Sequence, residues 1–257
     1  MSEVSVTFGM GEGVNPTEGA AASSPAVIEF LCDAEIADSI PHPQKSVRFA
    51  PDWFRNLERE MDLTYENGMT AGTVKACLPV TDAFSLGFVI PLPYDVQFLI
   101  PEDRVSIRMG WPDNCAFQPV EQHHPGQIGA PSPPFEAAMP LKFINPWRIK
   151  VPDGYSVLFM QVMNRPELPF TCFSGLVDCD RFATTINFPF LWTGPVGEFL
   201  LPAGSPMIQI VPVKRDALIK SHNVRAPSDD ERAEQETAQQ RKYNEESTYR
   251  REWRVKK

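Results

Sequence analysis

Residues 145–215 read NPWRIKVPDGYSVLFMQVMNRPELPFTCFSGLVDCDRFATTINFPFLWTGPVGEFLLPAGSPMIQIVPVKR, and this stretch decides the fold. Its apolar runs are short, rich in Val, Ile and Phe, and separated by turn formers such as Pro152-Asp153-Gly154. Runs of this length and composition are typical of antiparallel β-strands. We therefore predict strands over residues 147–151, 155–163, 170–177, 185–192 and 207–213.

The chain before this stretch has the same character. Residues 104–111 (RVSIRMGW) alternate apolar and polar side chains, which is typical of a strand with one exposed face. Residues 27–31, 88–92 and 95–100 are further predicted strands. The sequence thus predicts a mainly-β domain over residues 27–216, a β-clip or jelly-roll-like antiparallel sandwich with a few short helices of at most about 15 residues.

Two short helical segments are expected in the first half of the chain. Residues 51–60 begin with a proline, which suits the first position of a helix, and Trp53, Leu57 and Met61 recur at every fourth position. We predict a helix that covers a sheet with this apolar stripe. Residues 82–86 are expected to form a helical turn.

Both ends of the chain differ from this domain. Residues 1–26 are rich in Gly, Ala and Ser, so we predict a disordered tail. Residues 217–257 are predicted to form a polar, partly helical extension, with a helix over residues 232–246. Near its end, residues 249–253 (YRREW) are a candidate aromatic anchor onto the domain.

The composition argues against several classes of protein. The 257-residue chain has a net charge of −9, which argues against a general nucleic-acid binder. No apolar run reaches the ~18–20 residues that cross a bilayer, and the N-terminus lacks a secretory signal, so no membrane partner is expected. Five scattered cysteines without a CxxC pair favour free thiols and a cytoplasmic location. A homo-oligomer is compatible with all these features.

Two segments of the central stretch resemble motifs of the trimeric dUTPase and dCTP-deaminase superfamily. Residues 174–181 (SGLVDCDR) resemble its strand-turn motif, and residues 203–211 (AGSPMIQIV) resemble its later motif, in which a glycine turn leads into a strand. The resemblance implies that Asp178 lies at the sugar 3′-hydroxyl and orients the attacking water as a general base. It also implies that Gln209 lies near the phosphates.

The sequence departs from that superfamily at several positions. Arg181 replaces the tyrosine that packs on the deoxyribose, Phe182 follows it, and Ala183 replaces a glycine. The phosphate-binding Arg-Ser-Ser motif and the Gly-rich C-terminal arm are missing from the sequence. The resemblance therefore implies a β-clip-like or jelly-roll sheet, with Arg181 and Phe182 as ligand-binding residues beside the sugar.

From about residue 73 onward, the chain also resembles a protein family of unknown function from cyanophage and bacterial genomes. This second resemblance transfers no activity. The residues that carry it are Lys75, Cys77, Pro79, Asp82 and Ala83, then His124, Pro125 and Gln127, and then the segments 145–147, 154–156, 187–190 and 202–206 together with the aromatic and basic C-terminus.

Three side chains are candidate catalytic residues. Asp178 and Asp180 flank Cys179 in a predicted turn, where they either accept hydrogen bonds from backbone N–H groups or activate water or bind a cation. His124 lies within residues 112–140, a loop whose length indicates a functional role. We expect this loop and the turn at Asp178 to share a polar cleft.

The remaining polar residues suggest an anion site and no metal site. His123 and His124 would point to opposite faces of a strand, and no Cys or His pair has the spacing of metal ligands, so no metal ligand is predicted. Lys75, Lys142 and Arg148 form a candidate anion-binding spot, although ordinary solvated charges explain them equally well.

Three classes of function remain open. The first is a small-molecule or nucleotide-binding β-fold, including a hydrolase that uses a water activated by Asp178. The second is a metal-dependent, non-heme iron oxygenase on a cupin-like barrel. The third is a structural or assembly protein. The sequence identifies neither the ligand nor a cofactor.

Overall fold

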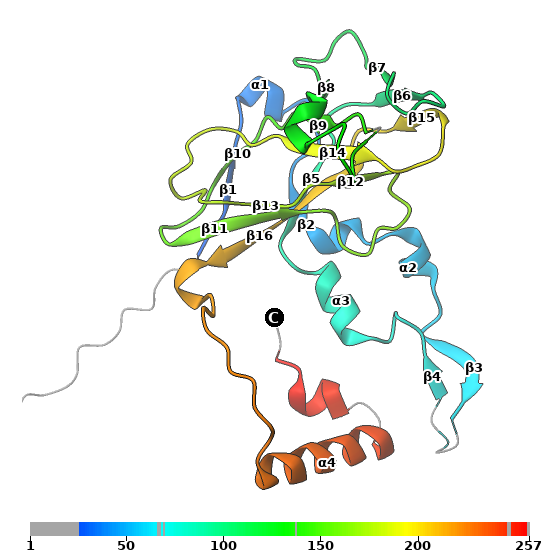
Figure 1. Cartoon of the computed structure of the whole chain (residues 1–257), viewed down its shortest axis with the longest axis vertical. Coiled ribbons are helices and arrows are strands. Elements are labelled where there is room, and N and C mark those ends of the chain that lie inside the picture. Colours follow the sequence, from blue (N-terminus) through cyan, green and yellow to red (C-terminus); the bar gives the residue numbers. More distant parts are fainter. Residues whose placement is uncertain (1–25, 66–67, 69, 137, 246–247, 256–257) are drawn as a thin grey trace, which may run out of the picture.

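The computed structural model describes residues 26–65, 68, 70–136, 138–245 and 248–255. Within these ranges the chain is mainly β, and its strands pair antiparallel in several sheets (Figure 1). The predicted mainly-β, antiparallel fold class is confirmed. The predicted disordered tail, residues 1–26, lies outside the described residues except for Ala26.

A five-stranded sheet forms one layer of the fold. Its two longest strands, β11 (Tyr155–Met160) and β16 (Pro206–Lys214), pair along the whole length of β11. The first five positions of β16 are all buried, which indicates a strand covered on both faces. Three shorter strands, β13 (Gly175–Val177), β5 (Phe88–Pro91) and β2 (Gln44–Lys45), complete the order β13-β11-β16-β5-β2.

Two further sheets supply the rest of the core. In both, buried positions alternate with more exposed ones, as expected for strands with one covered face. The four-stranded sheet has the order β12 (Phe170–Cys172), β14 (Phe188–Trp192), β9 (Leu141–Phe143), β8 (Val120–Gln122), and the three-stranded sheet has the order β15 (Gly197–Leu201), β6 (Val96–Ile100), β7 (Arg108–Gly110).

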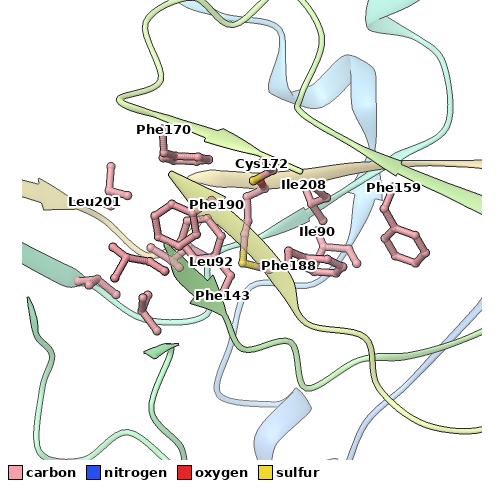
Figure 2. Packing of buried hydrophobic residues seen from close by; sticks show 14 of the residues in the cluster. Ile90, Leu92, Phe143, Phe159, Phe170, Cys172, Phe188, Phe190, Leu201 and Ile208 are labelled. Carbon is pink, nitrogen blue, oxygen red and sulfur yellow. The ribbon is translucent and has the colours of Figure 1, made fainter. Parts of the chain in front are cut away.

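Aromatic side chains join these sheets. Phe190 of β14 stacks on Phe143 of β9, with ring centroids 3.9 Å apart, and meets Phe98 of β6 edge-on. Figure 2 shows Phe143 and Phe190 in the same cluster as Ile90 and Ile208 of the five-stranded sheet. The three sheets therefore share one hydrophobic core, as in a sandwich.

A two-stranded ribbon lies beside this sandwich. Strand β1 (Glu29–Leu31) pairs with β10 (Arg148–Lys150), so the predicted strands over 27–31 and 147–151 are confirmed in part of each range. Helix α1 (Ala34–Ala37) follows β1 directly. Short 3-10 turns cover Ser46–Phe49, Pro125–Ile128 and Arg215–Ala217.

The predicted helix over residues 51–60 is wrong in its second half. Helix α2 (Asp52–Asn56) ends before Leu57, whose backbone is extended (φ −64°, ψ 136°). The chain then enters a hairpin formed by β3 (Glu60–Thr64) and β4 (Thr70–Gly72). Pairing within a local hairpin has overridden a helical pattern, which is a common outcome because helix propensity alone contributes little.

The predicted apolar stripe of that helix is also wrong. Trp53 and Met61 are exposed, whereas Phe54 is buried. Phe54 packs on Phe84, with ring centroids 4.4 Å apart. Phe84 ends helix α3 (Leu78–Phe84), which is the helix found where a turn over residues 82–86 was predicted.

Two predicted strands are shorter than expected. The strand predicted over 104–111 is confined to β7, because Asp103 accepts hydrogen bonds from the N–H groups of Val105 and Ser106, both at 2.9 Å, and holds a turn there. The strand predicted over 170–177 is divided into β12 and β13, which belong to different sheets.

The C-terminal extension is polar and partly helical, as the sequence predicts. Helix α4 (Asp229–Asn244) begins at Ser228, whose hydroxyl accepts a hydrogen bond from the Glu231 N–H in a capping box. Helix α4 buries none of its residues and lies away from the sheets (Figure 1). No helix in the described ranges combines the length and the apolar character needed to cross a bilayer.

Arg254 fastens this extension to the domain. After a π-helical turn (Tyr249–Trp253), the guanidinium of Arg254 donates to both carboxylate oxygens of Asp82 in α3, at 2.6 and 3.1 Å. The Asp82 side chain is buried, whereas Tyr249 and Trp253 are exposed. The anchor is therefore a charged residue and not the predicted aromatic pair.

The shared core predicts a single cooperative unfolding transition. Phe190→Ala is expected to lower the free energy of unfolding by about 3–5 kcal/mol, because it leaves a cavity between the sheets. Leu200→Ala, at an exposed position of β15, is the control and is expected to change it by less than about 0.5 kcal/mol. Urea unfolding followed by tryptophan fluorescence and by circular dichroism tests this, and two separate transitions would contradict a shared core.

The anchor predicts how the extension is released. Arg254→Ala is expected to increase amide hydrogen exchange severalfold across residues 228–255 while leaving exchange in β11 and β16 unchanged, since only the docking contact is lost. Arg251→Ala, which removes an exposed ion pair with Glu245, serves as the control. Equal exchange in the Arg254 and Arg251 variants would show that the ion pair to Asp82 does not hold the extension.

Candidate functional site

The turn after β13 carries two of the predicted catalytic carboxylates. Asp178 accepts a hydrogen bond from the hydroxyl of Ser156 at 2.6 Å, because the pairing of β13 with β11 places these residues opposite each other. Asp180 accepts a hydrogen bond from the N–H of Gly154 at 3.0 Å. Both carboxylates therefore face the start of β11.

Arg215, at the end of β16, binds both carboxylates. Its Nη1 donates to Asp180 Oδ1 at 3.0 Å and lies 3.4 Å from Asp178 Oδ1, and its Nη2 donates to Asp180 Oδ2. The same Nη1 also donates to the carbonyl of Tyr155 at 2.8 Å. We call Ser156, Asp178, Asp180 and Arg215 the Arg215 cluster. It joins the ends of β11, β13 and β16.

The two aspartates of the Arg215 cluster differ in accessibility. The Asp180 side chain is 3% exposed, and the hydrogen bonds from Arg215 and from the Gly154 N–H lower its pKa to about 2. Such a weak base is unsuited to general-base catalysis near neutral pH. The Asp178 side chain is 61% exposed, so it is the member of the cluster that solvent reaches. Its catalytic role stays a prediction.

Cys179, between the two aspartates, is not placed for nucleophilic chemistry. Its side chain is buried, and burial together with the negative charges of Asp180 and Asp178 raises its pKa to about 11. A thiol that stays protonated at neutral pH is a poor nucleophile.

The structure does not bring His124 to the Arg215 cluster. His124 is exposed and precedes the 3-10 turn at Pro125–Ile128, where its Nδ1 accepts a hydrogen bond from the Gly126 N–H at 3.1 Å. It follows β8, the edge strand of the four-stranded sheet, whereas Asp178 follows the edge strand of the five-stranded sheet. None of the hydrogen bonds among the described residues links His124 with either aspartate, and the shared cleft stays a prediction.

Gln209 has a structural position in β16. It is buried, its Oε1 accepts from the Met163 N–H at 2.9 Å, and its Nε2 donates to the Leu86 carbonyl at 2.7 Å. Its amide thus satisfies the backbone of two loops. The predicted ligand-binding pair, Arg181 and Phe182, is exposed, and both backbone N–H groups donate to the Asp178 carbonyl at 2.9 Å.

The three cations of the predicted anion-binding spot have different environments. Lys142 forms an ion pair with Glu121 at 3.0 Å, and Lys75 donates to the Arg55 carbonyl at 2.6 Å. Arg148 is half-buried, and its Nε is fully buried without a hydrogen-bond partner. No described residue forms an ion pair with its guanidinium. A buried N–H without a partner is rare and costs about 1–3 kcal/mol, so it calls for an explanation.

Arg148 lines a cavity of about 570 Å³, which we call the Arg148 cavity. Strand β1 and helix α1 form one wall, the connection from β9 to β10 forms another, and Thr185 closes a third. The polar lining residues besides Arg148 are Cys32, Asp33, Asn145 and Thr185, and the apolar ones are Leu31, Ile36, Phe117, Ile144 and Pro146.

Asn145 fixes the shape of the Arg148 cavity. It is buried, and its Nδ2 donates to the carbonyls of Trp147 and Ile186 at 2.8 and 3.1 Å. Its backbone N–H donates to Asn187 Oδ1 at 3.1 Å. These bonds hold the connection from β9 to β10 against residues 186–187, so two walls around Arg148 are fixed without a ligand. The signal in the sequence is Asn145-Pro146-Trp147, which directly precedes Arg148 and to which the sequence assigns no role.

One segment, residues 178–187, joins the Arg215 cluster to the Arg148 cavity. Near its start, Asp180 binds the Gly154 N–H, and near its end, Thr185 forms a bridge with Arg148. The Arg215 cluster therefore fixes the segment that supplies one cavity wall. The sequence points to both Asp180 and Arg148 as candidate site residues, but it does not show that one segment connects them.

Within the described residues, no group of three or more His, Cys, Asp and Glu side chains could hold a metal ion. The described sheets are open and none closes into a barrel. The described part of the chain therefore provides neither the metal ligands nor the cupin-like barrel that a non-heme iron oxygenase would need.

The ion pair of Asp180 predicts a pH-dependent stability. The folded pKa of Asp180, about 2, lies below its ordinary value of 3.8, so its contribution is present in full above pH 4 and is lost as the pH falls toward 2. Asp180→Asn is therefore expected to melt below the wild type at pH 7, and this difference is expected to shrink between pH 4 and pH 2.

Asp216→Asn is the matched control, because Asp216 pairs with the neighbouring Lys214 on the surface and is 70% exposed. Melting temperatures of the three proteins across this pH range test the prediction. A difference between Asp180→Asn and the wild type that stays constant down to pH 2 would contradict it.

Neither a scan against protein-family models nor a search of curated proteins finds a match to this chain. The resemblances to the dUTPase and dCTP-deaminase superfamily and to the cyanophage and bacterial family thus stay predictions.

Proposed function

We propose that this chain binds a small molecule with an anionic group in the Arg148 cavity. The observation that carries the proposal is that Arg148 lines this open cavity while no described residue forms an ion pair with its guanidinium. An anion at this position would give the guanidinium the partner that the protein does not supply.

The chemistry of arginine supports an oxyanion as the bound group. A guanidinium is planar and weakly hydrated, and it presents paired N–H donors that match a carboxylate or a phosphate. In a half-buried position the attraction is stronger than in bulk water, because the local dielectric constant is lower. The arrangement of Arg148 thus favours a carboxylate or phosphate over a neutral ligand.

The walls of the Arg148 cavity support an organic body on this anion. Ile36, Phe117, Ile144 and Pro146 give it an apolar lining, and its volume of about 570 Å³ is ample for a small organic molecule. Hydrolysis by a water activated at Asp178 receives less support, because Asp178 lies at the other end of segment 178–187 from Thr185 and Arg148.

Binding of three anionic probes tests the proposal: inorganic phosphate, 3-phenylpropionate and deoxyuridine monophosphate. At a concentration of 100 times its Kd, a bound probe is expected to stabilise the protein by about 2.7 kcal/mol, which corresponds to a rise in Tm of roughly 5–10 °C. Arg148→Gln is expected to weaken binding about tenfold or more, because charged hydrogen bonds to the anion are lost.

Arg108→Gln is the matched control, because Arg108 is exposed on β7 and does not line the cavity. It removes the same charge and is expected to leave binding unchanged. If no probe binds, or if the Arg148 and Arg108 variants bind alike, the proposal is wrong.

A further inference from the structure

The Arg148 cavity contains a second charged side chain, Asp33. It lies at the N-cap of helix α1, but its carboxylate forms no capping hydrogen bond. None of the other described residues forms an ion pair or a side-chain hydrogen bond with it, and it does not pair with Arg148. Asp33 is exposed and Arg148 is half-buried, so two opposite charges line one open cavity without forming an ion pair with each other.

The strand register explains why these two side chains are near each other without pairing. Leu31 of β1 is paired with Arg148 of β10, and Asp33 follows two residues later, just beyond the end of the strand. Asp33 therefore continues along the wall that Arg148 also lines.

From this arrangement we infer that the ligand is a small zwitterion, with an oxyanion bound by Arg148 and an ammonium group bound by Asp33. This inference rests on the proposed function and names its ligand class. An α-amino acid with an apolar side chain is the simplest member, since Phe117, Ile36 and Ile144 line the same cavity. A plain anion would be repelled by Asp33, so the carboxylate also provides selectivity.

Cys32 precedes Asp33 in the chain and lies near its charge. The pKa of its thiol is raised, first by burial and then by the negative charge of Asp33. Cys32 lines the Arg148 cavity as well.

Matched pairs of probes test the inference: phenylalanine against 3-phenylpropionate, and leucine against 4-methylpentanoate. Within each pair only the ammonium group differs. We expect the wild-type chain to bind the amino acid about tenfold more tightly than the plain acid in at least one pair, because a charged hydrogen bond to Asp33 is gained. Dissociation constants are measured by isothermal titration calorimetry.

Asp33→Asn is expected to remove this preference, with weaker binding of the amino acid and tighter binding of the plain acid. Glu35→Gln is the matched control: Glu35 lies in α1, carries the same charge and does not line the cavity. It is expected to keep the tenfold preference. Arg148→Gln is expected to weaken binding of both members of a pair.

The possible outcomes separate this inference from the proposed function. If plain acids bind in an Arg148-dependent manner but the amino acids bind no more tightly, or if Asp33→Asn keeps the wild-type preference, the zwitterion is wrong and the anion site stands. Both proposals are wrong if no probe shows binding that depends on Arg148. The probes are these acids, these amino acids, phosphate and deoxyuridine monophosphate.

Discussion

The bidentate ion pair between Arg215 and Asp180 is the contact on which the Arg215 cluster and segment 178–187 depend. It closes the ends of β11, β13 and β16 and uses the N–H of Gly154 as a further donor. Its second effect is at a distance: the segment that begins in this cluster reaches Thr185, which forms a bridge with Arg148. An electrostatic contact at one edge of the five-stranded sheet thereby fixes a wall of the cavity beside the β1–β10 ribbon.

Two arginines in this region differ in the partners that the described residues give to their guanidinium groups. Arg215 is surrounded by two carboxylates, a hydroxyl and a carbonyl, and its donors are used within the protein. Arg148 has its Nε buried with no partner, although Asp33 lines the same cavity. This difference between the two arginines is what the proposed anion site would require.

The sequence predicts the fold better than it predicts the site. Strands such as β11 and β16 follow from short apolar runs bounded by proline and glycine, which is local information. The helix predicted over residues 51–60 failed because its second half pairs with β4, and a periodicity of four cannot reveal such pairing. The partners in the Arg215 cluster are farther apart in the sequence: Asp180 and Arg215 are separated by 35 residues. Arg148 and Lys142 look alike in the sequence, and only the pairing of β8 with β9 gives Lys142 its partner Glu121.

The buried Nε of Arg148 also bears on how sequences related to this chain diverge. An unsatisfied buried donor lowers stability, and an apolar residue of similar volume at this position would remove that loss. Selection for stability alone would thus replace the arginine, and only selection for binding would retain it. A lineage that no longer meets the ligand is expected to lose arginine here early, while Asn145, whose side chain satisfies the backbone of both walls, persists because the fold itself requires it.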